Sequence, residues 1–109
     1  YNKNIDQTNS DILIPTEREN CKHVYHLYVI KTKRRNGLKE YLENHGIITT
    51  IQYPVPIHSQ PFYKNNNLNK DLSNTEIVAK NILSLPIYPE LKKNNVKKVI
   101  NCINSFYKN

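Results

Sequence analysis

The sequence contains no methionine and begins at Tyr1, and it has only two glycines among its 109 residues. Because translation starts with methionine, we expect this chain to be a fragment or a processed product. Gly37 and Gly46 are far apart, which excludes a glycine-rich loop that cradles phosphate. No apolar run reaches the roughly 18 residues of a membrane-spanning helix, so we expect no membrane partner.

Metal-binding patterns are also missing. Cys21 and Cys102 are far apart, and no C-x-x-C pair occurs. A structural zinc site needs about four ligands at suitable spacing, and the four histidines do not supply one. We therefore expect no metal site and two ordinary thiols, as in a cytoplasmic protein.

The chain carries a formal net charge of +7. A basic balance, with Tyr25 and Tyr28 on a predicted strand, leaves a small RNA-binding module as an alternative function. The lysines are scattered among many asparagines, however, and only residues 31–35 form a tight cluster. This cluster is expected to be a solvated turn between a strand and a helix. We therefore favour an interpretation without a nucleic-acid partner.

Strand and helix patterns alternate along the chain, which at this length predicts one α/β (α+β) domain. Its helices are expected to pack on a small sheet of about three to four strands. Strands are predicted at residues 12–14 on an edge, at 23–30 in the centre, at 47–53, and at 83–89 on an edge or end. Helices are predicted at 36–44, from Ser73 onward with apolar residues at 77, 78, 82 and 83, and across 96–107.

Local signals refine these elements. Gly46 suits the left-handed position after a helix, and Ser73-x-x-Glu76 is a capping-box pattern. Asn94 or Asn95 is the expected cap of the last helix. His26 lies within the predicted central strand, where a buried and hydrogen-bonded histidine is expected. Residues 63–72 have no periodicity and are predicted to form a loop.

The stretch Gln52–His58 reads Gln-Tyr-Pro-Val-Pro-Ile-His and leaves the end of a predicted strand. Its prolines make residues 54–61 a stiff, extended loop. The phenol of Tyr53 and the imidazole of His58 suit hydrogen bonds to a sugar hydroxyl or a phosphate oxygen. The alternative is that Tyr53 packs in the core and His58 is an ordinary loop residue. The residues themselves show no catalytic set.

Four motifs in order resemble the C-terminal domain of the DegT–DnrJ–StrS sugar aminotransferases. The first is the strand Val24–Ile30, and the second is an arginine-led helix, Arg35–Leu42, followed by Gly46-Ile47. The others are the proline loop Gln52–His58 and the segment Leu83–Leu91 with Leu-Ser-Leu-Pro and Pro-Glu-Leu. The resemblance runs from about Cys21 to the C-terminus. It implies that residues 1–20 are a linker, including the end of an interdomain helix and an edge strand, and that 21–109 are the small domain.

The resemblance implies a homodimeric enzyme that uses pyridoxal phosphate, a nucleotide-linked keto-sugar and, as the common donor, glutamate. The cofactor and its Schiff-base lysine would belong to a missing larger domain, so we assign this chain no catalytic and no cofactor-binding residue. Tyr53, His58 and Gln52 would border the substrate. Gln52 replaces a family histidine, and glutamine cannot titrate near neutral pH. A sugar dehydratase or a regulatory homologue on the same scaffold remains an alternative.

Overall fold

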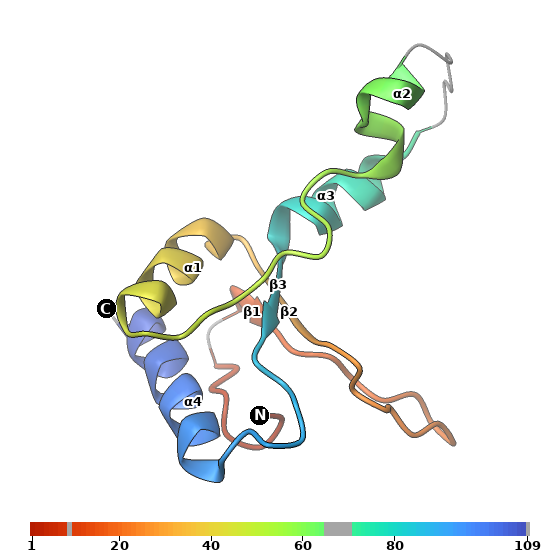
Figure 1. Ribbon diagram of the computed structural model, residues 1–109. Coiled ribbons are helices and arrows are strands. Elements are labelled where there is room, and N and C mark those ends of the chain that lie inside the picture. Colours follow the sequence, from red (N-terminus) through yellow and green to blue (C-terminus); the bar gives the residue numbers. More distant parts are fainter. Residues whose placement is uncertain (9, 65–70, 109) are drawn as a thin grey trace.

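The computed structural model describes residues 1–8, 10–64 and 71–108. It contains a three-stranded antiparallel sheet in the order β1-β2-β3, with helices packed against it (Figure 1). The elements in chain order are β1 (Ile12–Leu13), β2 (Tyr28–Thr32), α1 (Arg35–Asn44), the 3₁₀ turn η1 (Ile57–Ser59), α2 (Pro61–Lys64), α3 (Ser73–Asn81), β3 (Ile82–Leu85) and α4 (Lys93–Lys108). The predicted fold class is confirmed, with β1 and β3 at the sheet's edges.

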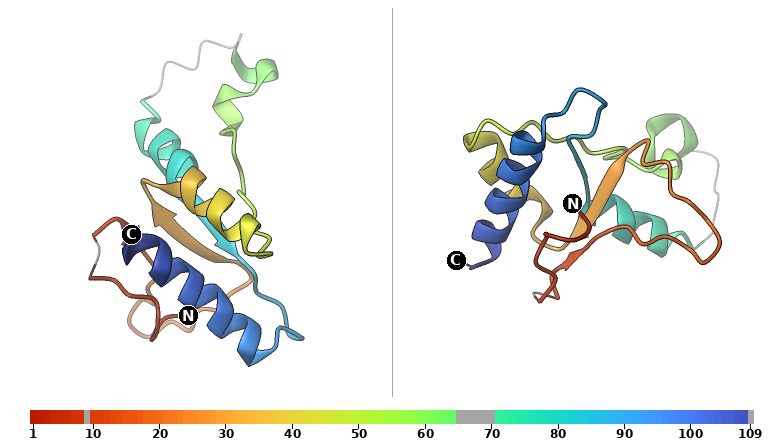
Figure 2. Two further views of the ribbon diagram at one scale, coloured as in Figure 1. Left: turned by 90° about the vertical axis from the view of Figure 1, so that its left-hand side faces the viewer. Right: turned by 90° about the horizontal axis from the view of Figure 1, so that it is seen from below.

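The hydrophobic core lies between the sheet and the pair α1 and α4, which cover the same face of it (Figure 2). Alternate residues of β2 point into this core, where Ile30 is fully buried. From α1, Leu38 and Leu42 meet Ile103 of α4, all three fully buried. Their spacing of three to four residues puts them on one face of each helix.

Helix α1 ends in a Schellman motif, as the position of Gly46 predicted. Gly46 has a φ of +71°. Its N–H donates to the carbonyl of Glu43, and the N–H of Ile47 donates to the carbonyl of Leu42, each at 2.9 Å. Ile47 and Leu42 are both buried in the core cluster, which is the apolar contact that accompanies this motif. The turn therefore fixes the direction in which the chain leaves α1.

The central strand occupies residues 28–32, and the prediction of 23–30 is wrong at both ends. The last paired residues are Tyr28 and Leu85. Beyond them lies Pro86, which has no N–H to donate, so the ladder stops there. His26 is consequently exposed before the strand, and the expectation of a buried histidine is wrong.

The predicted strand 47–53 is reduced to a single bridge, in which Thr50 exchanges two backbone hydrogen bonds with Ser84. The proline loop is also less extended than predicted. Residues 57–59 form η1, and Pro61 begins α2, a position that suits proline because its missing N–H is not needed there.

Helix caps differ from their predictions. Ser73 is the first residue of α3 rather than its cap, and its N–H donates to the Asp71 carboxylate at 3.0 Å. Helix α4 starts at Lys93, ahead of the predicted asparagine caps, because the carbonyl of Lys92 already accepts from the N–H of Val96. Helix α3 ends at Asn81, so Ile82 and Leu83 belong to β3.

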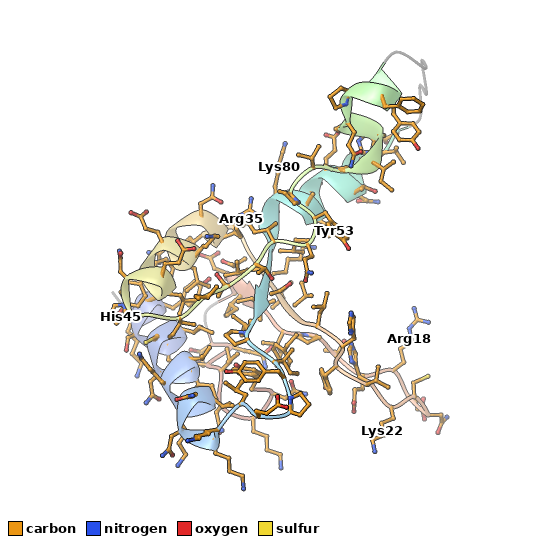
Figure 3. The ribbon with its side chains drawn as sticks, viewed as in Figure 1. Arg18, Lys22, Arg35, His45, Tyr53 and Lys80 are labelled. Carbon is orange, nitrogen blue, oxygen red and sulfur yellow. The ribbon has the colours of Figure 1, made fainter. Side chains whose placement is uncertain are left out.

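The basic cluster at 31–35 contains the predicted solvated turn, since Lys33 and Arg34 form an exposed turn between β2 and α1, but its other residues belong to these two elements. Thr32 is buried and hydrogen-bonds through its hydroxyl to Tyr107. The guanidinium of Arg34 lies 4.3 Å from the centre of the Phe106 ring, a cation–π distance. Arg35 reaches the end of α3, where its Nη1 lies 3.5 Å from the carbonyl oxygen of Ala79 and 3.4 Å from that of Ile82 (Figure 3). These two arginines thus tie the turn to α4 and α3.

The first residues of the chain are attached to the last elements. The Tyr1 hydroxyl donates to the carbonyl of Pro86 at 2.8 Å, and Ile5 is buried in the core. Asn104 of α4 accepts from the N–H of Asp6 at 2.9 Å and donates to the carbonyl of Asn4 at 3.0 Å. We call this pair of amide hydrogen bonds the Asn104 clasp.

Two segments project away from the sheet and from α1 and α4 (Figure 1). One is the irregular stretch 15–27. The other carries η1, α2 and α3, and we call its described residues, 53–64 and 71–81, the helical arm. Within the described ranges, every helix is too short or too polar to cross a membrane.

Candidate functional site

A cleft of about 580 Å³ opens beside β3, between the chain that follows α1 and the chain that leads into α4. Apolar side chains dominate its lining, with a few polar groups among them: Thr50, Gln52, Ser84, Tyr88, Asn95 and Lys98. This size and this lining are typical of small-molecule sites. Of the three predicted site residues, only Gln52 lines this cleft, and its Oε1 accepts a long hydrogen bond of 3.5 Å from the Ser84 hydroxyl.

Tyr53 is the next residue, and 75% of its surface is exposed. It lies where the chain leaves the sheet toward the helical arm (Figure 3). The alternative in which Tyr53 packs in the core is therefore wrong. An exposed phenol at the base of an arm is free to contact a ligand or another domain, and burial imposes no constraint on its hydroxyl.

His58 sits in η1, half-buried, with its Nε2 3.2 Å from Oε1 of Glu76 in α3. The sequence analysis assigned Glu76 to a capping box and missed this contact. The two residues are 18 positions apart, so no helical or strand periodicity relates them. The imidazole is thus held by a second element of the arm, and His58 is more than an ordinary loop residue.

The three predicted site residues consequently occupy three settings. Gln52 faces the cleft, Tyr53 is exposed beside it, and His58 is fixed within the arm. The sequence analysis also missed Asn95 and Lys98, which α4 contributes to the cleft. A spacing of three residues puts both on one helix face, which is the signal that could have found them.

The sequence model of the DegT/DnrJ/EryC1/StrS aminotransferase family matches residues 1–104. The chain belongs to this family. Among its relatives, a dTDP-3-amino-3,6-dideoxy-alpha-D-galactopyranose transaminase of Aneurinibacillus thermoaerophilus is 32% identical over 90% of the chain and 27% of its own length. A dTDP-3-amino-3,4,6-trideoxy-alpha-D-glucose transaminase of Streptomyces venezuelae is 34% identical over 83% of the chain and 24% of its own length.

Solved structures of the family have the same fold. DesV of S. venezuelae, crystallised in complex with a ketimine intermediate, superposes with a TM-score of 0.85 and 32% identity over 91% of the chain and 27% of its own. The ntda protein of Bacillus subtilis, solved with the bound cofactor PMP, gives a TM-score of 0.81 and 27% identity over 94% of the chain and 24% of its own. The chain spans about a quarter to a third of the relatives that it matches.

Proposed function

We propose that this chain is the small domain of a pyridoxal phosphate-dependent aminotransferase that aminates a nucleotide-linked keto-sugar, with glutamate as donor. The observation that carries the proposal is the family match over residues 1–104, together with relatives named as transaminases of dTDP-linked sugars. In the proposal the division of the chain is 1–20 as the linker and edge strand and 21–109 as the domain proper. The enzyme would be a cytoplasmic homodimer that serves amino-sugar and polysaccharide biosynthesis.

The described residues do not by themselves form a site for pyridoxal phosphate. Such a site needs a lysine for the Schiff base and a group that pairs with the pyridine nitrogen, usually an acidic residue. In the described part of the chain, Lys98 is the one lysine that lines the cleft, and neither Asp nor Glu lines it. We therefore assign the cofactor to a larger domain. The small domain formed by the present chain would supply part of the wall around the substrate.

Tyr53, His58 and Gln52 are the residues that we propose for substrate binding. Tyr53 offers an exposed hydroxyl, His58 offers a ring nitrogen on a fixed imidazole, and Gln52 offers an amide at the mouth of the cleft. The phenol and the amide are neutral, and the imidazole can be neutral. Neutral groups of this kind can form hydrogen bonds with sugar hydroxyls. The proline-rich segment between them limits the entropy lost when the substrate is bound.

The exposed apolar surface of the helical arm is a second observation that supports the proposal. Several of its large apolar side chains are exposed, among them Ile57 and Phe62 at 67% and 77%. Monomeric proteins rarely expose apolar groups that cluster in this way. A domain that is one part of a larger enzyme has a natural use for such a surface, because it packs against the remainder.

The test is an assay of the full-length protein with a dTDP-linked or UDP-linked keto-sugar, glutamate and pyridoxal phosphate. Formation of the amino-sugar and 2-oxoglutarate is the expected result, and the 109-residue chain alone is the control without activity. If the full-length protein bound the cofactor but moved no amino group to any keto-sugar offered, the proposal would fail.

One relative favours a second candidate. A "Pleiotropic regulatory protein" of Geobacillus stearothermophilus is 34% identical over 99% of the chain and 30% of its own length. A regulatory homologue, or a dehydratase on the same scaffold, would share the domain and differ in the larger part. The same assay separates them, because a dehydratase would release water from the sugar without consuming glutamate and a regulator would turn over neither substrate.

A further inference from the structure

We propose that Glu76 is a positioning residue, which occupies Nε2 of His58 and so leaves Nδ1 to accept a hydrogen bond from the substrate. This inference rests on the proposed function of the sugar site and adds to it a residue outside the proline loop. Its starting point is the 3.2 Å contact between His58 Nε2 and Glu76 Oε1.

The direction of this hydrogen bond follows from chemistry. An ionised carboxylate only accepts hydrogen bonds, so Nε2 must carry the proton and donate it to Glu76. The neutral imidazole then has its lone pair on Nδ1. Among the described residues, no hydrogen-bond partner engages Nδ1. Nδ1 is thus left to accept from a sugar hydroxyl, and the bond to Glu76 decides which nitrogen does so.

Glu76 lies on a helix whose end is fixed to the rest of the domain, while its own side chain is 50% exposed. Ala79, one turn further along α3, is buried, and residues three apart share a helix face. The end of α3 is anchored by Arg35, whose Nη1 reaches the carbonyl oxygens of Ala79 and Ile82. His58, by contrast, lies in a short turn beside the exposed Ile57. A group on an anchored helix therefore orients a group on a loop.

The first test reads the imidazole directly and needs no enzymatic activity. In nitrogen NMR spectra of the 109-residue chain, neutral His58 is expected to be protonated at Nε2. Glu76→Ala should give a mixture of the two tautomers, and Glu76→Gln should keep the Nε2–H form because its amide oxygen still accepts. Glu40→Ala, at an exposed glutamate of α1, is the matched control. An unchanged tautomer in Glu76→Ala would overturn the proposal.

The second test uses the full-length enzyme. Glu76→Ala is expected to raise KM for the keto-sugar by up to about tenfold, the most that losing one neutral hydrogen bond between His58 and the sugar would cost, and to leave kcat nearly unchanged. Glu76→Gln should restore most of the loss. In the His58→Ala background Glu76→Ala should add nothing, because the residue acts through His58. Additive effects, or a fall in kcat at unchanged KM, would show a structural role only. A wild-type enzyme without transaminase activity would reject the proposed function, and the NMR result would still decide the role of Glu76.

Discussion

Two tyrosines, Tyr28 buried and Tyr1 partly buried, join the amino terminus to the sheet. Tyr1 and Tyr28 pack with their ring centres 4.7 Å apart, and each hydroxyl donates a hydrogen bond, to the Pro86 carbonyl and to Asn2 respectively. Burial, with a smaller contribution from neighbouring tyrosines, raises the pKa of each phenol to about 12. Ionisation of either residue therefore opposes folding.

These raised pKa values make the free energy of unfolding depend on pH in the alkaline range. Between about pH 10 and 12 the unfolded chain loses these phenolic protons while the folded chain keeps them, so the free energy of unfolding falls as pH rises. Tyr28→Phe should flatten this fall, because phenylalanine cannot ionise. Urea unfolding at a series of alkaline pH values measures the slope, and Tyr53→Phe, at an exposed tyrosine, is the control. An equal slope in wild type and Tyr28→Phe would contradict the assignment.

The two glycines, Gly37 within α1 and Gly46 in the turn that ends it, provide a matched pair. Gly46 has a positive φ, where a side chain is strained, whereas Gly37 is a helical residue whose added methyl would meet Phe106 at an ordinary 3.6 Å. Gly46→Ala should lower the free energy of unfolding by about 1 kcal/mol, and Gly37→Ala should raise it by about 0.5 kcal/mol. Denaturant unfolding measures both. An unchanged or raised free energy of unfolding in Gly46→Ala would show that the Schellman turn does not depend on its left-handed residue.

The helices that carry long apolar stripes could be predicted from sequence, because their periodicity is local. Residues 36–44 fall almost wholly within α1, and the stripe through Ile103 lies on α4. The ends of the strands could not be predicted in this way, because they depend on the neighbouring strand with which each one pairs. Nothing near residues 23–27 shows that Pro86 will face them and end the ladder. The sequence also predicted the family, and of its three candidate site residues Gln52 lines the cleft. The exposure of Tyr53 was one of two alternatives that it left open.

The contact between His58 and Glu76 could not be predicted from local sequence patterns, because the two residues are 18 positions apart. The two side chains meet because η1 and α3 lie along the same arm. The spacing of the two residues in the sequence does not indicate that these elements are close. Ser73 and Glu76 matched a local capping pattern that the chain does not use. In this arm the tertiary contact overrides the local signal, which explains why the capping box was predicted and the pairing was missed.

At the scale of the whole molecule, the helical arm is the part of the domain that is least covered. We expect the isolated chain to self-associate through it, because burial of exposed apolar surface favours association. The double change Ile57→Ser and Phe62→Ser should weaken this association in sedimentation experiments over a range of concentrations. Val24→Ser is the control, since Val24 is 88% exposed on the other projecting segment. Undiminished association in the double variant would place the contact elsewhere.

The Asn104 clasp has a mechanical consequence. Because one side-chain amide holds the backbone at both Asn4 and Asp6, and Tyr1 and Asn2 contact Pro86 and Tyr28, a pull on the amino end would be shared between α4 and one end of the sheet. The beginning of the chain and α4 should therefore move together as one rigid body. A hinge between this domain and a segment joined to its amino end would have its pivot ahead of these contacts.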